Sequence, residues 1–82
     1  MFNELKKLLE DFNPTLTQIN GQYNLCSDIL VLSQTLYKGE IILFGYIENL
    51  DGSHGWIKVL DTEFGMREII DTAQSQVALR KP

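Results

Sequence analysis

The nine residues Glu40–Glu48 (EIILFGYIE) constrain the fold of this chain more than any other stretch. Isoleucine and aromatic residues dominate it, which is typical of a β-strand. It is apolar at both alternating sets of positions: Ile41, Leu43 and Ile47, then Ile42, Phe44 and Tyr46. Because alternate side chains of a strand point to opposite faces, we expect this strand to have cover on both faces, or at least a central place in a sheet.

Further strands are expected on either side of it. Residues 29–32 (ILVL) open one strand, and residues 38–39 (Lys-Gly) form a turn into Glu40–Glu48. Residues 49–55 are rich in turn-forming side chains, and residues 56–60 (WIKVL) form a third strand.

Helices are expected at both ends of the chain, because apolar residues recur there at helical spacing. The first stripe comprises Phe2, Leu5, Leu8, Leu9 and Phe12. It ends at Asn13-Pro14, since proline disfavours helical geometry in the preceding residue. The second stripe comprises Met66, Ile69, Ile70, Ala73 and Val77, with Asp61 or Thr62 as the N-cap.

Residues 14–26 fit two structures. In the first, Asn20-Gly21 forms a two-residue hairpin turn, which places Leu16 opposite Leu25 and Gln18 opposite Tyr23. In the second, a short helix starts at Pro14 and ends before Gly21. Ile19 would lie on the wrong face of the hairpin and favours the helix, so both structures remain open.

These elements predict a single domain over residues 1–82, of the α+β class. An antiparallel sheet of three to five strands carries an N-terminal and a C-terminal helix, in the order α–β–β–β–α. Residues 36–42 (LYKGEII), followed by residues 49–56 ending in Trp56, resemble the middle of an SH3 domain over about a quarter of the chain. That resemblance implies an alternative fold, an SH3-like small barrel with terminal helices.

Charge and hydropathy exclude several classes of function. Seven Lys and Arg stand against eleven Asp and Glu, a net charge of −4, whereas nucleic-acid binding needs clustered positive charge. No apolar run approaches the length of a membrane span, and the first residues lack the pattern of a signal peptide. Cys26 is the only cysteine, which suits a reducing compartment. We therefore expect a cytoplasmic protein with no direct nucleic-acid or membrane partner.

Residues that could carry chemistry are few. Asp51, Ser53 and His54 lie in one loop, which is too local for a catalytic triad and is better explained as a polar turn. Cys26 and His54 could form a thiolate pair, although nothing in their spacing supports it. Zinc normally takes four Cys or His ligands, and no glycine-rich phosphate loop is present. We expect no cofactor and no metal, and an enzyme using Cys26 or His54 is one alternative.

Protein binding is the function that the charge distribution favours. Residues 28–65 carry six acidic and two basic side chains, mostly at expected strand ends and turns. Such a rim could steer a basic protein partner towards the sheet, with aromatic anchors among the rings, Tyr23 and Tyr46 included. The candidate partner-binding residues are Tyr37, Glu40, Glu48, Asp51, His54, Trp56 and Asp61. For Trp56 and Tyr46, however, packing in the core is the stronger expectation.

We therefore expect a small acidic protein-binding module, an adaptor or an inhibitor without catalytic activity. By analogy of size and charge, it is of the kind that mobile elements and toxin–immunity pairs encode. An alternative is a structural or regulatory homo-oligomer, such as a homodimer, in which a second copy covers the apolar strand faces.

Overall fold

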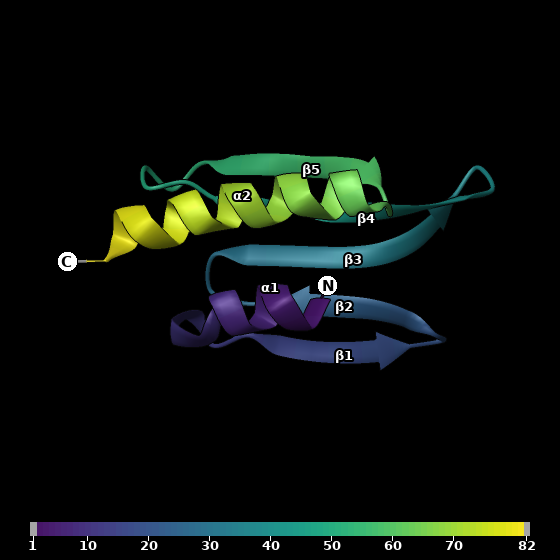
Figure 1. Cartoon of the computed structure of the whole chain (residues 1–82), viewed down its shortest axis with the longest axis horizontal. Helices are drawn as coiled ribbons and strands as arrows, with labels where there is room; N and C mark the ends of the chain where they lie inside the picture. The colour runs from purple at the N-terminus through teal and green to yellow at the C-terminus, as the bar shows by residue number, and fades with distance from the viewer. Residues whose placement is uncertain (1, 82) are drawn as a thin grey trace.

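The computed structural model describes residues 2–81, which form a five-stranded antiparallel sheet and two flanking helices (Figure 1). The strands follow one another across the sheet in the order β1-β2-β3-β4-β5. The elements are α1 (Phe2–Leu8), a 3-10 turn (Glu10–Phe12), β1 (Thr15–Ile19), β2 (Gln22–Cys26), β3 (Leu30–Tyr37), β4 (Glu40–Glu48), β5 (His54–Leu60) and α2 (Glu63–Arg80). The predicted α+β class, with a helix at each end of the chain, is confirmed.

Residues 14–26 form the hairpin and not the short helix. Leu16 pairs with Leu25 and Gln18 with Tyr23. Asn20 and Gly21 both have positive φ, 52° and 80°, as the tightest hairpin turn requires. Ile19, the residue that favours the helix in the sequence, lies on β1 with its side chain exposed to solvent.

The first helix is shorter than its apolar stripe. It is α-helical only to Leu8 and tightens into the 3-10 turn that ends at Phe12. Asn13 then adopts a left-handed conformation, with φ 54°. The main chain thereby leaves the helix before Pro14 and turns into β1.

Both helices pack on the same face of the sheet (Figure 1). α1 contacts β1 and β2, whereas α2 contacts β4 and β5. The Thr62 hydroxyl accepts a hydrogen bond from the Gly65 N–H and caps α2, as predicted. The core lies between the helices and this face; its largest fully buried side chains are Leu5, Leu9, Leu25, Leu30, Leu32, Leu43, Met66 and Ile70.

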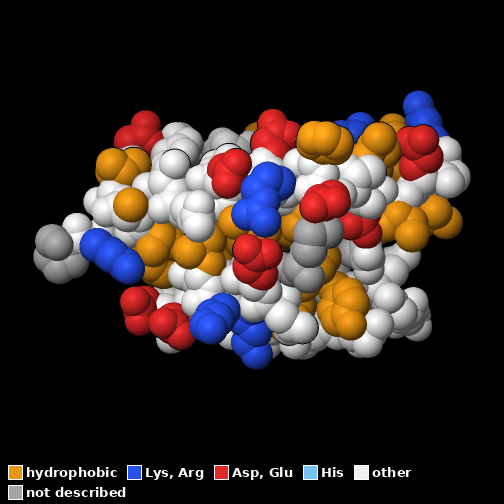
Figure 2. Space-filling view, in the orientation of Figure 1, with side chains coloured by type: hydrophobic (Ala, Val, Ile, Leu, Met, Phe, Trp, Pro, Cys, Tyr) orange, Lys and Arg blue, Asp and Glu red, His pale blue; other side chains and the backbone are white. Residues whose placement is uncertain are grey.

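The helix-covered face is seen in Figure 2, where acidic and basic side chains are interspersed over the helices. Near the tip of the β3–β4 hairpin, which extends past both helices (Figure 1), Leu36 and Ile41 are exposed. Among the described residues no helix is long and apolar enough to cross a membrane.

β4 is an interior strand, paired with β3 along one side and β5 along the other. Of its two apolar sets, Leu43 and Ile47 belong to the core beneath the helices. Strand alternation turns Ile42, Phe44 and Tyr46 to the opposite face, over which no described helix lies. We call this the open face. Since β1 and β5 are the two edges of the sheet and do not pair with each other, the SH3-like barrel is not the fold.

Candidate functional site

Four rings from two neighbouring strands form a cluster on the open face. Phe44 and Tyr46 come from β4, and His54 and Trp56 from β5. The register pairs Tyr46 with Trp56, and their ring centres lie 5.6 Å apart in an edge-on arrangement. The His54 ring stacks on the Tyr46 ring, with 4.4 Å between ring centres and 15° between ring planes. The ring centres of Phe44 and Trp56 lie 6.2 Å apart. We call these four residues the aromatic surface.

Trp56 is the most exposed member of the aromatic surface. Trp56 has a relative solvent accessibility of 70%, compared with 45% for Phe44. The expectation that Trp56 packs in the core is therefore wrong, and Tyr46, only partly buried, lies on the same open face. The physical reason is that both helices cover one face, so alternate residues of β4 and β5 have nothing above them.

A cation bridges strands next to the aromatic surface. Lys58 Nζ of β5 lies 4.4 Å from the centre of the Tyr37 ring on β3, within the range of a cation–π contact. Ile42 of β4 is the open-face residue between these two strands. It is only 7% exposed, which agrees with the Lys58 stem and the Tyr37 ring sheltering it.

Three of the four predicted acidic residues bond within the chain: Glu48, Asp61 and, in the loop described below, Asp51. Glu48 lies at the end of β4, and its carboxylate Oε2 is 3.9 Å from Nη2 of Arg80 on α2. The same Arg80 nitrogen donates a hydrogen bond to the backbone carbonyl oxygen of Glu48 at 2.7 Å. Asp61 accepts a hydrogen bond from Gln34 Nε2 at 2.6 Å. Glu40 is exposed and pairs with Tyr37 in the register.

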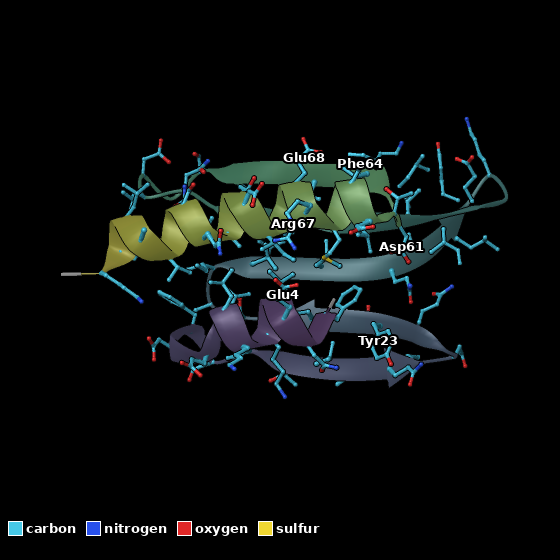
Figure 3. All side chains as sticks on the ribbon, viewed as in Figure 1. Glu4, Tyr23, Asp61, Phe64, Arg67 and Glu68 are labelled. Atoms are coloured by element: carbon cyan, nitrogen blue, oxygen red, sulfur yellow. The ribbon has the colours of Figure 1, made fainter. Side chains whose placement is uncertain are left out.

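The structure therefore divides the predicted partner-binding residues between two sides. His54, Trp56 and Tyr37 share the open face with the Lys58 bridge. Asp61 lines a cavity of about 210 Å³ together with Phe2 and Tyr23, on the helix-covered side, where Figure 3 labels Asp61 and Tyr23.

The loop between β4 and β5 is a polar turn. Asp51 Oδ1 accepts hydrogen bonds from the Ser53 hydroxyl at 2.6 Å and from the Ser53 N–H at 2.9 Å. These bonds hold the pKa of Asp51 below its usual value, because they favour the ionised carboxylate. Since the Ser53 hydroxyl bonds to Asp51 while His54 stacks on Tyr46, the three residues do not form a nucleophile–base relay.

Cys26 and His54 do not meet either. Both are exposed, but Cys26 is on β2, and three strand spacings of about 4.8 Å separate β2 from β5. A gap of about 14 Å is too wide for direct proton transfer between thiol and imidazole. No group of three or more potential metal ligands occurs within residues 2–81.

The sequence does not single out Phe44 or Lys58 as a partner-binding residue, and it indicates Tyr46 only as an anchor. The signal that could have found them is the alternation of β4 combined with a hairpin register. Once Tyr46 is paired with Trp56, Phe44 and Lys58 become the next pair on the same face. The sequence does not reveal which of the two apolar faces the helices cover.

Comparison of the chain with protein-family models, curated proteins and solved structures finds no match. The geometry of the open face is therefore the feature from which a function can be inferred.

Proposed function

We propose that this protein is a small acidic protein-binding module, an adaptor or an inhibitor, that contacts its partner through the open face of its sheet. The single observation that carries the proposal is the aromatic surface, with Trp56 70% accessible to solvent at its centre. Contiguous exposed apolar surface on a small soluble domain marks a site of interaction. Tryptophan and tyrosine are also the residues that most often dominate binding energy at protein interfaces.

The ring contacts support binding by a preformed surface. Tyr46 touches both His54 and Trp56, and Phe44 flanks Trp56 on the other side. Side chains held by neighbours on a rigid sheet lose little conformational freedom when a partner binds. The surface is therefore suited to a flat or ridged protein face with an apolar centre.

Electrostatics favour a basic partner. The chain carries a net charge of −4, and a negative field raises the association rate of basic proteins. The carboxylates of Glu48 and Asp61 already bond within the chain. We therefore expect salt to slow association more than it weakens the final contact.

Affinity capture from extracts of the source cells, at low and high salt, tests the proposal. Wild-type protein should capture a partner from the extract. The amount of that partner captured by the Trp56→Ala variant should be at least tenfold lower. The matched control is Phe64→Ala, since Phe64 is 91% exposed but lies at the start of α2, on the other side of the sheet. Equal loss with both variants, or no loss with Trp56→Ala, would refute the open face as the binding surface.

A further inference from the structure

We propose that two copies of this chain associate through β5, edge to edge and antiparallel, to form one continuous ten-stranded sheet. This inference goes beyond the proposed function, because it concerns the edge of the sheet and not its open face. The contact would use the backbone hydrogen-bonding groups that β5 leaves unpaired.

The register determines which groups these are. The Glu48 N–H donates to the Ile29 carbonyl, towards β3, and the Asp61 N–H donates to the Ile41 carbonyl of β4. Because bonding direction alternates along a strand, Gly55, Ile57 and Val59 bond to β4. The backbone N–H and C=O groups of the residues between them, Trp56 and Lys58, then point to the free edge.

The β5 edge lacks the usual protection against pairing. It pairs with β4 over seven consecutive residues without a bulge, and it contains no proline. Its one lysine, Lys58, is turned across the open face to the Tyr37 ring. Exposed edges of this kind are templates for another strand.

The sequence of β5 is self-complementary about Ile57, the middle residue of the strand. A twofold axis there places Ile57 opposite Ile57 of the second copy, Gly55 opposite Val59, and Trp56 opposite Lys58. Trp56 and Lys58 then exchange backbone hydrogen bonds in both symmetry-related pairs. An axis at Lys58 would oppose two like charges, and an axis at Trp56 would leave two residues of each strand unpaired.

The helix-covered side also has room for a second copy. A cavity of about 390 Å³ lies along β5 and is lined by Ile57 and Val59 of that strand and by Glu68 and Ile69 of α2. Figure 3 shows Glu68 on the β5 side of α2. Since α2 lies over β4 and β5 and strands are about 4.8 Å apart, the two copies of α2 would lie about 10 Å apart, an ordinary helix-packing distance.

The mass of the purified protein in solution tests the proposal. Wild-type protein should have twice the chain mass of 9.4 kDa, and Lys58→Pro should reduce it to a single chain. The N–H that proline removes points away from β4, so the fold should survive, as circular dichroism would check. The matched control is Gln18→Pro, since Gln18 occupies the corresponding outward position on the other edge strand, β1, and this variant should remain a dimer.

A disulfide trap keeps the proposal testable if the proline variant fails to fold. In a Cys26→Ser background, Ile57→Cys should cross-link under mild oxidation, because directly opposed residues of this type lie about 4.5 Å apart. Val59→Cys should not, since the two copies of position 59 would lie about 14 Å apart. A monomeric wild type, a dimeric Lys58→Pro, or equal cross-linking at both positions would overturn the proposal. None of these outcomes bears on partner capture through the open face.

Discussion

Both faces of this sheet carry apolar side chains, but these are buried on one face and exposed on the other. On the helix-covered face, Leu32, Leu43 and Ile47 are buried beneath α1 and α2. On the open face of the same sheet, Phe44 and Trp56 are exposed to solvent. From Leu43 to Ile47, the residues of β4 thus alternate between the helix-covered face and the open face.

This difference shows that apolar content alone does not reveal which residues stabilise a fold. The free energy gained by burial follows the apolar area removed from water, and that area is large only on the covered face. We infer that the covered face carries the stability of the domain and that the open face carries its binding.

Leu43→Ala should be the most damaging substitution, because it removes a side chain that is fully buried beneath the helices. We expect a loss of about 3–4 kcal/mol of unfolding free energy, out of about 4–12 kcal/mol for a domain of this size. Urea unfolding followed by circular dichroism measures it. A loss of unfolding free energy below about 1 kcal/mol would mean that Leu43 is not buried beneath the helices.

Ile42→Ala tests the exception on the open face, since Ile42 is sheltered there beside Lys58 and Tyr37. We expect a loss of about 2 kcal/mol, because the flexible lysine stem can collapse into part of the space. The same unfolding experiment on Lys58→Ala should show a smaller loss. If Ile42→Ala has no effect, Lys58 and Tyr37 do not shelter this position.

Trp56→Ala should cost less than about 1 kcal/mol of unfolding free energy, although it deletes the largest side chain in the protein. The ring is mostly exposed, and it contributes mainly cross-strand contacts with Tyr46 and Phe44. Comparison with Leu43→Ala in the same urea titration sharpens the division between the faces. A loss as large as that of Leu43→Ala would place Trp56 in the structural core.

Ser53→Ala should have the smallest effect, confined to the loop between β4 and β5. Removing the hydroxyl that donates to Asp51 should raise the pKa of Asp51 towards its usual value. In the wild type the lowered pKa gives stability above the unfolded-state pKa, which is lost as pH falls through the folded-state pKa. An NMR titration of the Asp51 carboxyl group checks this; an unchanged pKa would show that the hydroxyl bond is not formed in solution.

Much of the fold could be predicted from the sequence, because local signals and global packing agree. The Lys38-Gly39 turn, the Thr62 cap and the apolar run of β4 each specify their element. Residues 14–26 were undecided because a single isoleucine, Ile19, counted against a hairpin that the Asn20-Gly21 turn favours. Ile19 is in fact exposed, which strand periodicity alone cannot reveal.

The candidate site is harder to predict from the sequence, because its exposure depends on which face of the sheet the two helices cover. The aromatic or loop character of Tyr37, His54 and Trp56 predicts a role in binding, and the structure places all three on the open face. Asp61 was selected for its charge, yet it bonds to Gln34 on the helix-covered side. A carboxylate's hydrogen-bond partner comes from the tertiary fold, so its availability could not be inferred from charge alone.

The most direct test uses the fluorescence of Trp56, the only tryptophan in the chain. We expect a soluble quencher such as acrylamide to reach the ring readily in the free protein. After binding to the captured partner, quenching should fall several-fold, provided that the partner's own tryptophans are replaced or subtracted. A ring already shielded in the free protein, or quenched equally with and without the partner, would contradict the assignment of the open face as the binding surface.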